Sequence, residues 1–381
     1  MDFTIKNKLF FYSITIVIVL NFIGIFFQMT RADYSILLFS HILIFIVYLF
    51  NLKKILSVIN HKIILIFFGF MLVSILLDHL INISFNVIDF SLPAYKSFFV
   101  NFLHNFLLGG LLVKTFEENK KFIKSSYLKL ITIICLTICI FVFYETFFLT
   151  RFEENISRAI FLGNNNLYQT FADYFSRLVI LLLFLNEYIL NKKNKKINSL
   201  ISFVIILGFL FITVSGSAKG PLFLVLILFF LFFSIPQYLK IVYFGIAIYF
   251  LFYINILDIF NPRFFTSALS GFTNRLTFLD NFTELFMYNP IFGSFYSHDV
   301  LGVDYIHSSI LSSFTGVGLI GGFLFLIINI DMIFRGFNLG GFLKFLTIII
   351  ILISNAATYF DWFLFWFCCG IIYNSKKIVY E

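Results

Sequence analysis

Three polar stretches interrupt an otherwise apolar chain, and the last of them, residues 258–307, carries the side chains best suited to acid–base chemistry. It contains Arg263, Arg275 and His307. An imidazole titrates near neutral pH and can accept a hydroxyl proton, so His307 is the leading candidate for a general base, facing the arginines across a site. A histidine at the start of a helix is also common as an interfacial polar residue, and that interpretation stays open.

The second stretch is a tight turn, Ser215-Gly216-Ser217-Ala218-Lys219-Gly220-Pro221, between two very apolar runs. Its glycines let the backbone approach a ligand closely. Lys219, together with backbone N–H groups at the start of the next helix, could hold a phosphate group. The alternative is a polar hairpin whose lysine extends to the membrane surface.

The first stretch along the chain begins at Arg158 and continues through a Gly-Asn-Asn-Asn sequence into an apolar run that carries Asp173 and Arg177. Asp173 and Arg177 are four residues apart, so on a helix they share a face and can pair. Charges inside a membrane are costly and normally face the bundle interior or a wet cavity. A structural ion pair and a substrate contact are equally open here, and Glu145 could belong to the same network.

The elements that position these residues must be membrane helices. Of the 381 residues, 61% are hydrophobic and 12% are charged, whereas charged residues make up about a quarter of a soluble domain. Because a lipid-exposed backbone must satisfy its own hydrogen bonds, the apolar runs are expected to be helices of about 20 residues. We therefore predict an all-α polytopic integral membrane protein, a single membrane domain over 1–381 with about twelve spans. They are expected near 9–27, 34–50, 63–77, 98–113, 128–149, 167–190, 199–214, 221–235, 239–257, 307–330, 343–357 and 360–373.

The basic residues predict the orientation of these spans. With a cytoplasmic N-terminus, 18 of the 27 Lys and Arg residues fall in inner segments and 7 in outer ones, which is a positive-inside pattern. Both termini are then cytoplasmic, and 258–306 becomes one large periplasmic loop. Apolar residues recur there at intervals of three and four, which predicts an amphipathic helix over about 274–288, ended by Asn289-Pro290.

Several functions are disfavoured by the same composition. The net charge of +8 comes from short basic clusters between apolar runs, which argues against nucleic acid as a partner. The chain has no glycine-rich phosphate loop, HExxH or CxxC motif, so no metal or cofactor is expected. The four cysteines, Cys135, Cys139, Cys368 and Cys369, lie inside apolar runs and are interpreted as packing residues.

The three polar stretches, taken in their order along the chain, resemble the O-antigen polymerase and O-antigen ligase superfamily. The first matches an Arg followed by Gly and Asn at the opening of a middle span, in Arg158…Gly163-Asn164-Asn165-Asn166-Leu167. The second matches a Ser-rich turn with a cation around Lys219, although Arg is frequent there and Lys lacks its bidentate fork. The third matches an Arg, an Asn-Pro-hydrophobic-Phe-Gly element and a His before a Gly-rich span, in Arg275…Asn289-Pro290-Ile291-Phe292-Gly293…His307-Ser308-Ser309. The similarity covers roughly residues 155–325.

The resemblance implies glycosyl transfer at the periplasmic face of the bacterial inner membrane, from a glycan carried on undecaprenyl diphosphate and without a metal or nucleotide sugar. Lys219 and Arg275, with Arg158 or Arg263, would bind the diphosphate and stabilise the charge that develops on it. His307 would remove the proton from the acceptor hydroxyl. The implied partners are undecaprenyl-diphosphate-linked oligosaccharides, membrane lipids and a chain-length regulator protein.

In this superfamily the catalytic half of a polymerase, which here corresponds to roughly residues 155–325, can look like that of a ligase. The polymerase, which joins lipid-linked repeat units of a surface polysaccharide, is favoured because the richness in Phe, Ile, Asn and Lys suits an A+T-rich gene of a variable polysaccharide cluster. The alternative is an O-antigen ligase or a related lipid-linked glycan transferase. A flippase or other transporter would also have about twelve helices and internal charges, but such proteins usually lack one dominant outer loop.

Overall fold

The computed structural model describes residues 46, 49, 52–84, 95, 97–118, 180, 184, 281–295, 297, 301–303, 306, 308–357, 360 and 362–376. Within these residues every regular element is a helix and none is a strand, which confirms the helical fold class for this part of the chain. The number of spans and the periplasmic loop stay predictions.

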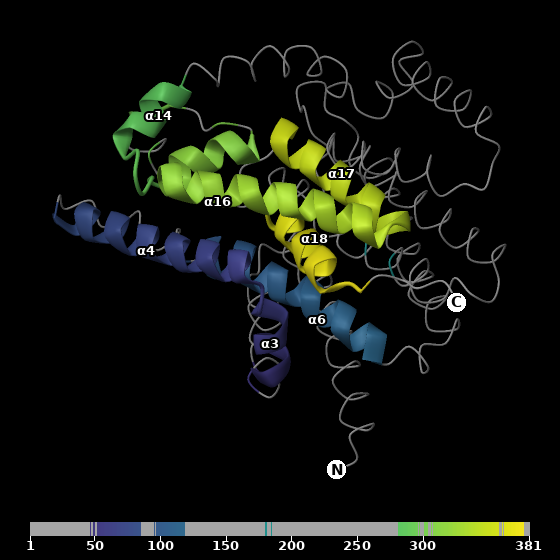
Figure 1. The fold of residues 1–381 in the computed structure, drawn as a ribbon. Coiled ribbons are helices and arrows are strands. Elements are labelled where there is room, and N and C mark those ends of the chain that lie inside the picture. Colours follow the sequence, from purple (N-terminus) through teal and green to yellow (C-terminus); the bar gives the residue numbers. More distant parts are fainter. Residues whose placement is uncertain are drawn as a thin grey trace, which may run out of the picture. The chain divides into compact units, whose positions relative to one another are not determined.

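The chain divides into two compact units, and the unit formed by Leu52–Lys114 and Gly271–Glu381 contains nearly all the described residues. Its elements, labelled in Figure 1, are α3 (Leu52–Ile59), α4 (Lys62–Ser84), the π-helix η2 (Ser97–His104), α6 (Asn105–Glu118, whose last turn falls in the other unit), α14 (Phe282–Tyr288), α16 (Ser309–Leu339), α17 (Gly341–Ala357) and α18 (Phe363–Asn374). From the other unit, Met1–Asn51 with Thr115–Ser270, only the last turn of α6, Ile46, Leu49, Ile180 and Phe184 are described.

Two of these helices, over Lys62–Leu80 and Ser309–Leu339, are long and apolar enough to cross a membrane. The second is broken at Val317 and Gly318, and at 1.5 Å per residue its part from Leu319 to Leu339 extends over about 32 Å. Shorter apolar helices occupy Leu343–Asn355 and Phe363–Asn374. By length and composition, therefore, this unit contains candidate membrane helices.

Helices are present where five of the twelve spans were expected. The ranges 63–77, 98–113, 307–330, 343–357 and 360–373 fall on α4, on η2 with α6, on α16, on α17 and on α18, respectively. α17 ends at Ala357, α18 begins at Phe363, and the described residues between them, Phe360 and Trp362, are not helical, so the last two ranges correspond to separate helices. The expected spans at 9–27, 128–149, 199–214, 221–235 and 239–257 lie outside the described residues, and those at 34–50 and 167–190 are described at two positions each, all four of them helical.

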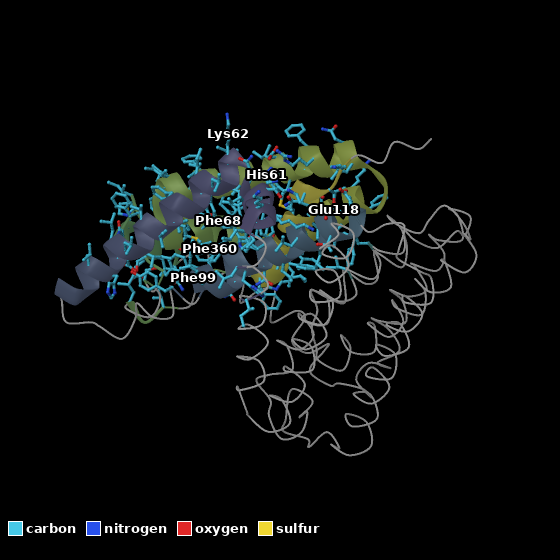
Figure 2. All side chains as sticks on the ribbon, turned by 90° about the horizontal axis from the view of Figure 1, so that it is seen from below. His61, Lys62, Phe68, Phe99, Glu118 and Phe360 are labelled. Carbon is cyan, nitrogen blue, oxygen red and sulfur yellow. The ribbon has the colours of Figure 1, made fainter. Side chains whose placement is uncertain are left out.

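The core of the unit is a cluster of aromatic rings around Trp366 of α18. Phe67 of α4 stacks on it at 5.4 Å between ring centroids, and the rings of Phe102 and Phe325 lie at 5.1 and 5.9 Å. The Trp366 indole Nε1 donates to the carbonyl of Phe360 at 3.0 Å, so this buried N–H has a hydrogen-bond partner. Figure 2 shows Phe68 and Phe360 within this cluster. The rings hold α4, η2, α16 and α18 together.

Glycines bring α6 and α18 into backbone contact. A Cβ added at Gly109 would meet the carbonyl oxygen of Phe367, and one added at Gly370 would meet that of Phe106. Small residues permit this close helix approach, which is how membrane helices gain van der Waals contact. Cys368 and Cys369, next to Gly370, are free and fully buried, in keeping with packing residues; Cys135 and Cys139 lie outside the described residues.

Candidate functional site

All eight charged residues proposed from the sequence lie outside the described residues. They are His307, Arg275, Lys219, Arg158, Arg263, Asp173, Arg177 and Glu145. The structure therefore neither brings them together nor separates them. It does describe the Asn-Pro-Ile-Phe-Gly element that lies between Arg275 and His307 in the sequence, and the helix that follows His307.

The Asn-Pro-Ile-Phe-Gly element forms a tight turn directly after α14. The helix ends at Tyr288, with Asn289 as its C-cap, because Pro290 has no N–H to continue the helical bonding. The Asn289 side-chain oxygen accepts from the N–H of Phe292 at 3.3 Å, and its carbonyl accepts from the N–H of Gly293 at 2.8 Å. The expected end of the amphipathic helix is thus where the structure has it. The described helix begins at Phe282, and the expected first residues, 274–280, lie outside the described part.

This turn is built into a break in α16. The break lies at Val317 and Gly318, where the backbone leaves helical geometry and Gly318 takes φ 70° and ψ −172°. In an uninterrupted helix the N–H of Leu319 would donate to the carbonyl of Thr315. Here Leu319 donates instead to the carbonyl of Pro290 at 2.8 Å, and the Thr315 carbonyl accepts from the N–H of Ser294 at 3.0 Å. The turn therefore supplies the two backbone partners that the broken helix lacks.

Glycine is required on both sides of this contact. Gly293 has φ 72°, and a Cβ there would meet the backbone of Gly318 and Val317. A Cβ on Gly318 would meet the carbonyl group of Ile291. The Asn-Pro-Ile-Phe-Gly element and the Gly-rich helix after it thus each need a glycine for one physical reason, the close approach of their backbones at Gly293 and Gly318. Figure 1 shows α14 beside the first turns of α16.

The same turn is fastened to α4 by a buried carboxylate. The Ser294 hydroxyl donates to Asp78 Oδ2 at 3.2 Å, and the two residues are 2% and 6% exposed. Phe292 stacks on Phe70 of α4 with ring centroids 6.1 Å apart. Partial burial, and then the Asp78 carboxylate, raise the pKa of the Tyr288 phenol above its usual value. Asp78, Ser294 and Tyr288 therefore lie close together at one end of α4.

The first turn of α16, which begins two residues after His307, is held by groups from elsewhere in the unit. Ser308 is the N-cap, and its hydroxyl accepts from the N–H of Leu311 at 3.5 Å. The side-chain oxygen of Asn355 on α17 accepts from the Ser309 hydroxyl at 3.1 Å and from the N–H of Ile310 at 3.0 Å. An amide from a neighbouring helix thus satisfies one of the free donors that a helix start leaves.

The opposite end of these helices is basic. Lys114 donates to the hydroxyl of Ser57 at 2.8 Å, and the Arg335 guanidinium lies 4.5 Å from the ring centre of Tyr373, whose ring is 5.2 Å from that of His61. Burial first, and then the Arg335 and Lys114 charges, lower the pKa of His61 below its usual value. Figure 2 labels His61 and Lys62 where α4 begins.

The described Lys and Arg residues all belong to the basic end of the unit. They are Lys53, Lys54, Lys62, Lys114, Arg335, Lys344 and Lys376. The positive-inside count assigned each of them to the cytoplasmic side, and that orientation stays a prediction.

Two described residues of this region, Asp78 and Asn355, were not proposed as site residues from the sequence. Asp78 had a signal, because it is an ionisable residue at the end of an apolar run, and such residues are functional candidates. Asn355 had only a weak one, an amide in a long apolar segment. Among the described residues no group of three or more His, Cys, Asp or Glu side chains could hold a metal ion.

No protein-family model matches the chain. No curated protein matches it significantly.

Proposed function

We propose that the chain is a polymerase of O-antigen or a related surface polysaccharide, which joins undecaprenyl-diphosphate-linked repeat units at the periplasmic face of the inner membrane. The observation that carries this proposal is the order of three sequence elements. They are Arg158 with its Gly-Asn sequence, the Ser-rich turn with Lys219, and Arg275 followed by the Asn-Pro-Ile-Phe-Gly turn and His307. The turn is hydrogen-bonded into the break of α16, which supports reading the third element, from the turn through the following helix, as one structural unit.

The proposed reaction is the attack of an acceptor sugar hydroxyl on the anomeric carbon of the donor glycan. A new glycosidic C–O bond forms, and the bond between the anomeric carbon and the diphosphate breaks. His307 takes the hydroxyl proton, and undecaprenyl diphosphate leaves with the electron pair. Lys219 and Arg275, with Arg158 or Arg263, stabilise the negative charge on the leaving group. Asp173, Arg177 and Glu145 form a secondary polar network.

An O-antigen ligase is the first alternative, since only the acceptor differs. A transporter is the second, and one observation favours it: Asp78 is a buried carboxylate at the end of a candidate membrane helix. Intramembrane carboxylates of this kind also serve proton- and ion-coupled transport.

A gene deletion in the native host separates these functions on a gel of the surface polysaccharide. Loss of a polymerase leaves the lipid A core bearing a single repeat unit. Loss of a ligase leaves bare core and an accumulation of lipid-linked polymer, and loss of a flippase leaves neither product. The first pattern supports the proposal, and either of the others overturns it.

Complementation of the deletion with single variants tests the site. We expect His307→Ala and Arg275→Ala each to abolish the long-chain ladder while the protein accumulates in the membrane at the wild-type level. Lys53→Ala, an exposed cation at the basic end of the unit, serves as the matched control and should restore the ladder. Wild-type banding with both site variants would contradict the catalytic assignment.

A further inference from the structure

Asp78 has an unmet need for hydrogen-bond donors. A carboxylate has about four acceptor positions, and among the described residues only the Ser294 hydroxyl donates to it. None of the described cations pairs with it. At 6% exposure it has little access to bulk water, and a buried carboxylate without enough partners is costly.

Two neighbouring polar atoms have no hydrogen-bond partner among the described residues. Ser74, four residues earlier on α4 and therefore on the same helix face, is 2% exposed, and its hydroxyl makes no hydrogen bond. The adjacent His79 has a buried Nδ1 that makes none either. Orphaned polar atoms are rare in folded proteins and call for an explanation. Two of them, Ser74 Oγ and His79 Nδ1, flank the under-satisfied Asp78 on a stretch of six residues and indicate a missing polar ligand.

The surroundings of these groups specify the kind of ligand. The Tyr95 ring lies 5.8 Å from that of His79, and Tyr288, which is 40% exposed, is near enough to Asp78 for the carboxylate charge to act on its phenol. None of the described Lys and Arg residues lies at this end of the unit, and the Asp78 carboxylate would repel a phosphate. A ligand here must satisfy the unpaired polar atoms and pack against the tyrosine rings. A sugar does both, because its hydroxyls donate and accept hydrogen bonds and its C–H faces pack on aromatic rings.

We propose that Ser74, Asp78 and His79 form a subsite for sugar hydroxyls of the lipid-linked oligosaccharide, at the end of α4 where the Asn-Pro-Ile-Phe-Gly turn is fastened. This inference rests on the proposed function. It assigns a glycan-binding role to α4, a helix that lies outside the three polar stretches on which the proposed function is based. Asp78 accepts from the sugar, Ser74 donates or accepts, and His79 takes the remaining contact. The residues determine which sugar is accepted and do not take part in bond making.

The bond from Ser294 offers a matched pair of variants. Asp78→Asn keeps a side-chain oxygen that can still accept from Ser294 but loses the charge, whereas Ser294→Ala removes this bond and leaves the carboxylate. If Asp78 serves the sugar, Asp78→Asn should raise KM for lipid-linked repeat units roughly ten- to hundredfold at similar kcat, since hydrogen bonds to a charged group are the strong ones. Ser294→Ala should change KM much less. Ser74→Ala should give a smaller rise than Asp78→Asn.

The assay uses the full chain in lipid nanodiscs with lipid-linked repeat units extracted from the deletion strain. An Asp78→Asn enzyme with wild-type KM, or one affected no more than Ser294→Ala, would show that the carboxylate only fastens the turn and would overturn the inference. Thermal unfolding of each variant identifies effects that come from misfolding. If Asp78→Asn unfolds, Asp78→Glu takes its place. Asp78→Glu keeps the charge but displaces it, and it should also raise KM.

A binding measurement distinguishes failure of this inference from failure of the proposed function. The probe is the radiolabelled oligosaccharide repeat released from its lipid by mild acid, added to the full chain in nanodiscs. Binding to the wild type and its loss in Asp78→Asn support the subsite even if the wild type forms no polymer. Equal binding by wild type and Asp78→Asn, or no binding by either, overturns the subsite whatever the outcome of the gel.

Discussion

Replacement of Gly318 by alanine tests whether the turn at 289–294 and the break in α16 form one structural unit. Gly318 has φ 70° and ψ −172°, a region that is essentially restricted to glycine and costs another residue about 1–3 kcal/mol. Its new Cβ would also meet the carbonyl group of Ile291. Relief of that overlap requires the turn to move away, with loss of the bonds Leu319–Pro290 and Ser294–Thr315, at about 1 kcal/mol each. The expected loss is about 3–5 kcal/mol of unfolding free energy.

Gly340 provides a control with the same backbone geometry. It has φ 72° and ψ −172°, and nothing lies within 4 Å of the position its Cβ would take. Gly340→Ala therefore has the strain of the left-handed conformation without the overlap. The difference between the two variants isolates the docked turn and should be about 2 kcal/mol.

Unfolding of the full chain in mixed micelles, followed as a function of the SDS fraction, measures both free energies. The polysaccharide gel in the complemented deletion strain gives a second readout, in which Gly318→Ala should shorten or remove the ladder and Gly340→Ala should retain it. Equal destabilisation by the two variants would refute the account of the turn as a partner of the broken helix.

Three further predictions follow from the described contacts. Gly370→Ala should lower the thermal unfolding midpoint because its Cβ meets the carbonyl of Phe106, whereas Gly69→Ala, with nothing within 4 Å, should leave it unchanged or raise it slightly; equal midpoints would contradict the close approach of α6 and α18. Trp366→Ala should cost about 3–5 kcal/mol in the SDS titration, since its ring is fully buried among aromatic partners; a loss below about 1 kcal/mol would contradict its central position in the core. Because the pKa of His61 is lowered in the folded state, the unfolded chain binds a proton more readily, and stability should fall as the pH drops through about 6.5. His61→Gln should weaken this dependence when unfolding is measured from pH 5 to pH 8, and an unchanged pH profile would argue against a buried neutral imidazole.

Helix positions in the described unit were predictable because local sequence is enough to specify them. A long apolar run must satisfy its backbone within the membrane, so α4, α16, α17 and α18 fall on the runs that were expected to be spans. The end of α14 was predictable for a similar reason, because Pro290 terminates a helix wherever the chain goes afterwards.

The features that shape the site depend on partners far away in the sequence, which local patterns do not reveal. The break at Gly318 is stable because Pro290 and Ser294 supply its missing backbone bonds. Asp78 and Ser294 are 216 positions apart. The separation of α17 from α18 is similarly fixed by the Phe360 N–H, which donates to the hydroxyl of Ser312, 48 positions earlier. Apolar periodicity indicates that a helix exists, but it does not show where another segment will interrupt it.

The most direct measurement of the proposed activity is polymer formation by the purified full chain in nanodiscs, supplied only with undecaprenyl-diphosphate-linked repeat units. Chain-length analysis of the products in EDTA-containing buffer should show a ladder of joined repeat units and an equivalent release of undecaprenyl diphosphate, both abolished by His307→Ala. Single repeat units that stay unjoined with the wild type, while the same preparation transfers preformed glycan to lipid A core or moves it across a vesicle membrane, would contradict the assignment as a polymerase.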